Sequence, residues 1–245
     1  MLFIHEMPHI VISSALISWF ICSFASFTLL TVSILNPQWL QRELSDESLK
    51  LTQCFDQNNY DLVKISHEPP SIGPIFRCQY NCIAKNATLI EKVFTCNLSI
   101  YGHGDSYALA SGPFILSTSL ISFGYILLIP ASIMICLSFF KREIFERSTF
   151  SITGIIQCIA NLMILAGLVL WPAGWDSIPI REVCGGSATR YHVGNCYLNW
   201  IPIASLIGVI LLFISATLSV ITDQSIVNYF VTRQLLLNGK KFLYV

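Results

Sequence analysis

Charged residues are scarce in this chain, and the scarcity decides its class. Asp, Glu, Lys and Arg make up 11% of the 245 residues, whereas soluble domains carry about 25%. The few charges are also segregated. Four long stretches contain none of them, namely 7–41, 106–140, 148–175 and 191–222. One such stretch is compatible with the core of a soluble protein, but four in a chain of this length are not.

The charge-free stretches are long enough to cross a membrane. A hydrocarbon core about 30 Å thick requires about 20 apolar residues in a helix. Four segments reach this length, at about Ile10–Leu35, Gly112–Phe140, Phe150–Trp171 and Trp200–Thr222. We interpret the first as a span and not a cleaved signal peptide, because its apolar region is too long and no Lys or Arg precedes it. The sequence therefore predicts a single tetraspan membrane domain over residues 1–245.

Several classes of activity lack the residues that they need. No ionisable side chain lies in the middle of a predicted span, which argues against ion pumps, proton relays and charge-coupled transport. The formal net charge is +0, so nucleic acid is not an expected partner. A membrane thiol oxidoreductase requires a reactive Cys-x-x-Cys pair, and the chain has none. Gln157 and Asn161 share one helical face. One interpretation is that they contact a polar substrate or ion, and the other is that they form hydrogen bonds between helices. The second interpretation is favoured.

Two groupings of reactive residue types have simpler explanations than catalysis or metal binding. In "YGHGDS" (His103–Ser106 and its neighbours) the polar side chains are too close in sequence to point at one another, and the glycines predict a turn. Cys78 and Cys82, with His67 or His192, lack the second matched pair that is usual in structural zinc sites. We expect no catalytic residue, no metal and no cofactor.

The basic residues predict the orientation. The segment Lys141–Arg147, "KREIFER", joins the second and third spans, and the tail carries Arg233, Lys240 and Lys241. Short loops rich in Lys and Arg stay on the cytoplasmic side. The predicted cytoplasmic parts are the N-terminus, 141–149 and 223–245, and the predicted extracellular parts are loop one, 36–111, and loop two, 172–199. We expect a multi-pass protein of the plasma membrane.

Glycosylation acceptors and cysteines agree with this orientation. The tripeptides "NAT" at Asn86 and "NLS" at Asn97 both fall in loop one and are N-glycosylation acceptors. Six of the nine cysteines lie in the predicted extracellular loops, namely Cys54, Cys78, Cys82, Cys96, Cys184 and Cys196. An even number is typical of disulfide bonds in an oxidising compartment. Cys22, Cys136 and Cys158 lie within spans and are expected to behave as small apolar residues.

Loop one is too long to be a simple connector, and its pattern is that of a small sheet. The runs "YDLVKIS", "SIGPIFRCQY" and "KVFTCNLSI" alternate or are rich in branched and aromatic residues, with turn signals between them. So small a sheet has few residues for a core, so disulfides are expected to stabilise it. The predicted fold is an all-α membrane four-helix bundle with a small, disulfide-braced extracellular antiparallel β-sheet.

Four motifs in the loops resemble a known family. They are "NPQWL" after the first span, "SIGPIFRCQY" in loop one, "LWPAGWDS…REVCG" after the third span and "VGNCYLNW" before the fourth. In this order they resemble the lipoma HMGIC fusion partner-like tetraspans, which are relatives of claudins in the claudin-like superfamily. Claudins carry Gly-Leu-Trp before their first loop cysteine. This chain has "GPIFRC" there, which fits the fusion partner-like branch better.

The resemblance implies a disulfide pairing. Family members pair cysteines within each loop, which here would be Cys78 with Cys96 and Cys184 with Cys196. Cys54 and Cys82 are additional to the family pattern, and a second loop-one bridge between them is the corresponding hypothesis.

The resemblance also implies structural roles for loop residues. Trp39 matches the tryptophan that packs the sheet onto the bundle in claudin-like proteins. Loop two would form a rigid surface for a partner, with structural or interface roles for Trp171, Pro172, Gly174, Trp175, Gly185 and Trp200. Because tryptophans anchor at the bilayer boundary, we expect Trp171, Pro172 and Trp175 to lie there.

The functional expectation is a non-enzymatic partner protein. Studied members of the family act as auxiliary subunits of ion channels and of neurotransmitter or mechanosensory receptors, in assembly, trafficking, clustering or gating. The expected partners are membrane lipids and pore-forming channel or receptor subunits. A claudin-like role in cell–cell adhesion or junctions is the alternative. The tail ends in Leu243, Tyr244 and Val245, which resembles ligands of PDZ scaffolds; an interfacial helix with Lys240 and Lys241 near lipid headgroups is the other interpretation.

Overall fold

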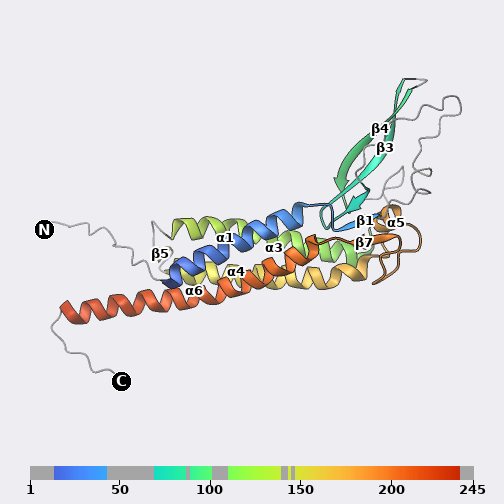
Figure 1. Cartoon of the computed structure of the whole chain (residues 1–245). Coiled ribbons are helices and arrows are strands. Elements are labelled where there is room, and N and C mark those ends of the chain that lie inside the picture. Colours follow the sequence, from blue (N-terminus) through green and yellow to red (C-terminus); the bar gives the residue numbers. More distant parts are fainter. Residues whose placement is uncertain are drawn as a thin grey trace. The chain divides into compact units, whose positions relative to one another are not determined.

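The protein is dominated by four long helices. The computed structural model describes residues 14–42, 69–86, 89–100, 110–138, 143–144 and 147–237. The long helices are α1 (Ser14–Leu35), α3 (Gly112–Leu137), α4 (Thr149–Leu170) and α6 (Ile201–Leu237) (Figure 1). Each is long and apolar enough to cross a membrane. A helix satisfies all of its backbone polar groups within one segment, as the hydrocarbon core requires. The protein is thus a multi-pass membrane protein, as predicted.

The helix boundaries follow from local sequence. Pro113 and Pro202 are the second residues of α3 and α6, where the missing N–H of proline has no intrahelical partner to lose. Helix α6 extends to Leu237, well beyond the predicted end of the fourth span at Thr222. No glycine or proline interrupts 223–237, so nothing in this stretch stops the helix. The start of the predicted cytoplasmic tail is therefore helical.

The sheet combines strands from both loops. Loop one contributes β1 (Leu40–Arg42), β2 (Ser71–Ile72), β3 (Phe76–Asn86) and β4 (Leu89–Leu98), and loop two contributes β7 (Cys196–Leu198). The strands are antiparallel in the order β4-β3-β2-β1-β7, with Leu40 opposite Leu198 and Cys78 opposite Cys96. The antiparallel loop-one sheet is confirmed over the second and third predicted runs, whereas "YDLVKIS" lies outside the described residues. The strand from loop two was not predicted.

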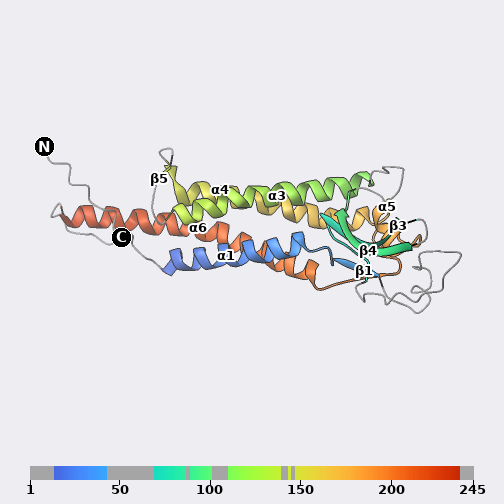
Figure 2. The same ribbon diagram turned by 90° about the horizontal axis from the view of Figure 1, so that it is seen from above.

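Two short elements complete loop two. A single 3-10 turn, Trp171–Gly174, continues from α4, and α5 (Ile178–Cys184) follows it. Pro179 lies in the first turn of α5, and the helix packs against β1 and β2, beside the sheet in both views (Figures 1 and 2). Strands β5 (Glu143–Ile144) and β6 (Arg147–Ser148) pair with each other between α3 and α4.

The chain forms two compact units, and every long helix has residues in each. The first comprises 1–28, 124–162 and 207–245, and the second comprises 29–123 and 163–206. Among the described residues, the first has a core of Leu16, Trp19, Ile135, Phe150 and Ile226. The second has a larger core, built from Trp39, Leu40, Ile72, Ala110, Phe114, Trp171, Ile180, Val183, Cys184, Ala188, Cys196 and Ile201. This second core contains side chains from both loops.

A polar cluster joins three helices inside the first unit. Gln157 of α4 is buried; its Nε2 donates to Ser23 Oγ of α1 at 3.1 Å, and its Oε1 accepts from Ser215 Oγ of α6 at 3.3 Å. The hydroxyls of Ser23 and Ser215 are also hydrogen-bonded to each other. Asn161 is buried one turn further along, and its Oδ1 has no hydrogen-bond partner in the described parts of the chain. For Gln157 these contacts support hydrogen bonding between helices.

Replacing Gln157 with leucine is expected to destabilise the helix packing modestly. The leucine keeps a similar volume but leaves Ser23 and Ser215 without the amide, and one hydrogen bond between membrane helices contributes about 1 kcal/mol. Unfolding in mixed detergent would measure the change in free energy. Thr28→Val is the matched control, because the exposed Thr28 hydroxyl bonds only to carbonyls of its own helix. A Gln157→Leu variant as stable as the control would contradict this role.

Candidate interaction surface

Tryptophans connect the start of loop one to the start of loop two. Trp39 is buried, and its Nε1 donates to the carbonyl of Ser33 in α1 at 2.7 Å. Its ring meets Trp171 edge-on, with centroids 4.9 Å apart, and Trp171 meets Trp175 in the same way at 5.7 Å. Edge-to-face aromatic pairs at such distances are favourable beyond their buried area. Trp39 therefore packs the residues after α1 against the end of the third span, and its role in packing the sheet onto the bundle stays a prediction.

The predicted position of Trp171 at the bilayer boundary stays a prediction, but its indole is not free to contact the bilayer. Only 2% of Trp171 is exposed, because the core of the second unit encloses its indole. Trp175 is half-buried against the same core. Trp200, directly before α6, is 62% exposed and is the tryptophan whose position suits a membrane interface.

Gly174 allows a close approach between loop two and α3. A Cβ built on Gly174 would lie 2.7 Å from both the Cα and the Cβ of Phe114, and 2.8 Å from its backbone nitrogen. The neighbouring Pro172 carbonyl accepts from the backbone N–H of Tyr191 at 3.1 Å, which connects the 3-10 turn to the far part of loop two. The glycine of the "WPAGW" run is therefore required by packing and not by an unusual backbone conformation.

Gly174→Ala is expected to destabilise the protein by about 1–3 kcal/mol, the usual effect of overpacking a tight core. The added methyl group meets main-chain atoms of Phe114, so α3 and the turn must separate. The shift in the midpoint of thermal unfolding in detergent would measure the effect. Gly186→Ala is the control, because a Cβ there meets no atom within 4 Å. Equal stability of the two variants would contradict the proposed close packing.

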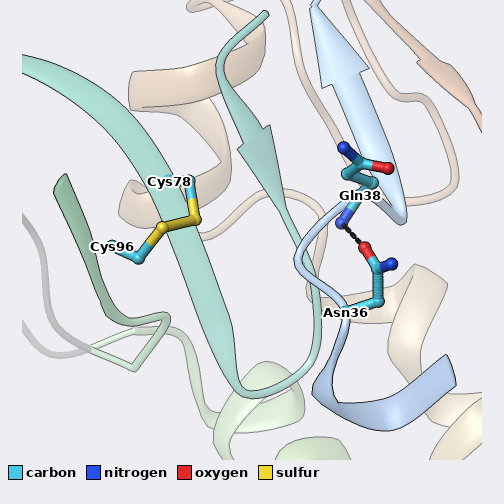
Figure 3. The surroundings of a disulfide bond; sticks show 4 residues. All are labelled: Asn36, Gln38, Cys78 and Cys96. Carbon is cyan, nitrogen blue, oxygen red and sulfur yellow. Dashed lines mark hydrogen bonds between the residues drawn. A yellow bond between two sulfur atoms is a disulfide. The ribbon is translucent and has the colours of Figure 1, made fainter. Parts of the chain in front are cut away.

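Disulfides close both loops. Cys78 and Cys96 face each other across β3 and β4 and are bonded (Figure 3), and Cys184 at the end of α5 is bonded to Cys196 in β7. Both are the pairs that the family resemblance implied. Cys54 lies outside the described residues, as does the side chain of Cys82, so the hypothesis of a bridge between them stays a prediction. Cys22, Cys136 and Cys158 are free thiols.

A turn lies near each bridge. Asn36 Oδ1 accepts from the backbone N–H of Gln38 at 2.8 Å, which stabilises the turn between α1 and β1 (Figure 3). Gly185 ends α5 with φ of +90°, a conformation that L side chains rarely adopt, while its N–H donates to the carbonyl of Arg181. The chain reverses there, and the backbone N–H of Asn195 donates to the Cys184 carbonyl at 2.9 Å.

A buried ion pair, which sequence reasoning missed, joins the two loops. Arg77 of β3 is 1% exposed, and its Nη1 lies 2.5 Å from Oε2 of Glu182 in α5. The Glu182 side chain is 29% exposed. Arg77 Nε has no hydrogen-bond partner among the residues that the structure describes. Arg77 lies in "FRCQY" and Glu182 in "REVCG", two motifs that carried the family resemblance. Their presence in these motifs was the one sign in the sequence that the two residues matter.

Loop two presents a set of exposed side chains, two of them on β7. Tyr191 is 70% exposed within a tight turn whose flanking residues, Thr189 and His192, hydrogen-bond to each other through their backbones, and its φ is +62°. Such a conformation is strained for a bulky residue, and strain of this kind is often found at functional sites. The exposed apolar side chains of loop two and its junction with α6 are Ile178, Tyr191, Tyr197, Leu198 and Trp200. Aromatic residues of this type are enriched at protein interfaces.

The structure describes only some of the other residues that the sequence singled out. His103–Ser106, His67 and the tail residues Leu243, Tyr244 and Val245 lie outside the described residues. Within the described ranges, no group of three or more His, Cys, Asp or Glu side chains is placed to hold a metal ion. His192 is exposed, and its Nδ1 accepts from the backbone N–H of Gly194 at 3.2 Å.

The family model described as "Lipoma HMGIC fusion partner-like protein" matches residues 15–224. The chain belongs to this family. The match reaches into all four apolar helices and includes both loops, and these helices with the small disulfide-linked antiparallel sheet are the claudin-like tetraspan fold.

Individual members of the lipoma HMGIC fusion partner-like family share about a third of their residues with this chain, over part of its length. The chain is 32% identical over 111 residues to LHFPL tetraspan subfamily member 2a protein of Danio rerio, covering 45% of this chain and 49% of the relative. It is 31% identical over 156 residues to the human member 2 protein, covering 63% and 66% of the two chains. It is 30% identical over 88 residues to the human member 4 protein, covering 35% and 36%. The matches thus span less than two thirds of the length of these relatives.

Proposed function

We propose that this protein is a non-enzymatic auxiliary subunit of an ion channel or of a neurotransmitter or mechanosensory receptor complex. In this role it acts on the assembly, trafficking, clustering or gating of pore-forming subunits in the plasma membrane. Membership of the lipoma HMGIC fusion partner-like family supports a tetraspan that works with other membrane proteins. The sequence lacks mid-span ionisable residues, which does not favour a transport pathway of its own.

The observation that carries the proposal is the cross-linked unit made from both loops. The Arg77–Glu182 ion pair, the contact between Trp39 and Trp171, and the pairing of β1 with β7 hold loop one to loop two. Such a framework presents Tyr191 and its exposed neighbours in one fixed conformation. Preorganisation of this kind reduces the entropy cost of binding a protein partner.

The proposed orientation places both loops outside the cell and both termini in the cytoplasm. The basic segment Lys141–Arg147 and the basic tail support it through the preference of Lys and Arg for the cytoplasmic side. Epitope tags at each terminus and within loop one, stained before and after permeabilisation, would test it. A terminal tag that stains on intact cells would contradict the orientation.

Native extraction tests the function. In gentle detergent, the tagged protein is expected to co-purify with a larger channel or receptor assembly in stoichiometric amount, identified by mass spectrometry. A Tyr191→Ala variant is expected to reach the surface normally but to lose the partner, because an exposed aromatic contact is removed. Gly186→Ala is the matched loop-two control. Repeated recovery of the free chain or of homomers alone would contradict the proposal.

A claudin-like role in adhesion or junctions is the second candidate. The two-loop sheet, in which β7 pairs with β1, is the feature that favours it. This role predicts enrichment at contacts between expressing cells and altered paracellular resistance. The absence of both would exclude it, and their presence without a co-purifying channel would replace the first proposal.

A further inference from the structure

The two glycosylation acceptors of loop one differ in their structural setting. Asn86 is the last residue of β3, and the threonine of its acceptor tripeptide lies outside the described residues. Asn97 lies in β4, opposite Arg77, and is exposed. A glycan on Asn97 is therefore compatible with the finished fold.

The serine of the Asn97 acceptor is inaccessible once the hairpin has formed. Ser99 is 0% exposed. Its Oγ donates to the carbonyl of Pro74 at 2.6 Å, and its backbone N–H donates to the carbonyl of Ile75 at 2.8 Å. Transfer of an N-glycan requires the Asn-x-Ser/Thr tripeptide, including its hydroxyl, to enter the transferase. In the folded hairpin Asn97 is therefore accessible, but the hydroxyl of Ser99 is not.

The disulfide next to the acceptor holds it in this state. Cys96 directly precedes Asn97 and is bonded to Cys78 on β3. The bond keeps β4 paired with β3, so the segment Asn97–Ser99 cannot separate from residues 74–76 without breaking the pairing. Disulfides form in the same oxidising compartment in which loop one, in the proposed orientation, would receive glycans.

We propose that Asn97 is glycosylated only before the Cys78–Cys96 disulfide closes, so that the two modifications compete during synthesis. In the transfer step, Nδ2 of Asn97 attacks the anomeric carbon of a lipid pyrophosphate-linked oligosaccharide. An N–C bond forms, the C–O bond to pyrophosphate breaks, the lipid pyrophosphate leaves, and one amide proton passes to a base of the transferase. Disulfide closure withdraws the Ser99 hydroxyl and ends the period in which this step can occur. The proposal rests on the outward orientation of loop one.

Single-acceptor variants test the competition. In an Asn86→Gln background, synthesised with microsomes under oxidising conditions, Asn97 is expected to be partly occupied. The double variant Cys78→Ser, Cys96→Ser, or addition of dithiothreitol during synthesis, is expected to raise the occupied fraction about twofold, since no bridge then closes the hairpin. The shift in gel mobility that is removed by an N-glycosidase measures occupancy. Cys184→Ser, Cys196→Ser is the control and is expected to leave occupancy unchanged.

The outcomes separate this proposal from the orientation on which it rests. Full occupancy in the oxidised parent protein, or no rise without the Cys78–Cys96 bridge, overturns the competition. An equal rise in the loop-two control overturns the specific role of this bridge. An Asn97→Gln variant shows whether Asn86 is modified. If Asn86 is modified in that variant and Asn97 is never modified in the Asn86→Gln background, only the competition fails. If neither site is modified even in the reduced, cysteine-substituted chain, the outward orientation fails as well.

Discussion

Replacing Glu182 with alanine is expected to lower the free energy of unfolding by about 3 kcal/mol, because it leaves the buried charge of Arg77 without its partner. This is at the lower end of the range for buried pairs, since the Glu182 side chain is partly exposed. The loss also removes the ion pair between α5 and β3, which is one of the contacts that connect the two loops. Thermal unfolding in detergent would measure the stability, and surface biotinylation would measure the fraction that leaves the secretory pathway.

An exposed ion pair in the same loop provides the control. Arg190 and Asp176 are 2.9 Å apart, but the Arg190 side chain is 66% exposed. Asp176→Ala is therefore expected to cost less than about 1 kcal/mol, as exposed pairs do. The double variant Arg77→Met, Glu182→Leu removes both charges together and is expected to be more stable than Glu182→Ala alone. If Glu182→Ala and Asp176→Ala behaved alike, the buried pair would not hold the loops together.

Loss of the loop-two disulfide is expected to have an effect of similar size. The Cys184–Cys196 bridge spans 12 residues, and opening a loop of this size costs about 3 kcal/mol in the chain-entropy model. The bridge joins the end of α5 to β7, so its loss also weakens the pairing of β7 with β1. Cys184→Ser and Cys196→Ser are both expected to be retained inside the cell, as measured by surface biotinylation and by the maturity of attached glycans.

Free cysteines provide the comparison for this experiment. Cys136 and Cys158 are exposed thiols on α3 and α4. Cys136→Ser and Cys158→Ser remove a thiol without opening a bridge, so near-normal delivery is expected. Normal surface delivery of both Cys184→Ser and Cys196→Ser would show that loop two keeps its structure without the bridge.

Much of the architecture could be predicted from local sequence. The apolar stretches marked all four long helices because a membrane span depends on length and composition alone. The "FRCQY" and "FTCNL" runs marked β3 and β4 because strand patterns are also local. The disulfide pairs came instead from the family resemblance, since six loop cysteines allow several connectivities. Asn161 shows the limit of periodicity, because it shares a face with Gln157 but not its hydrogen bonds.

By itself the sequence determined the class of this protein, a tetraspan with two loops. Hydropathy, charge segregation and short motifs are properties of residues close together in the sequence, so they do not depend on the fold. Only the tertiary structure decided which residues connect the loops. Arg77 and Glu182 are 105 positions apart, and neither has a local pattern that names the other. Trp171 resembled a membrane anchor by its place at the end of a span, yet it is enclosed by Trp39 and its neighbours. Contacts between distant segments depend on how β1, β7 and α5 pack together, and that packing is a property of the whole fold.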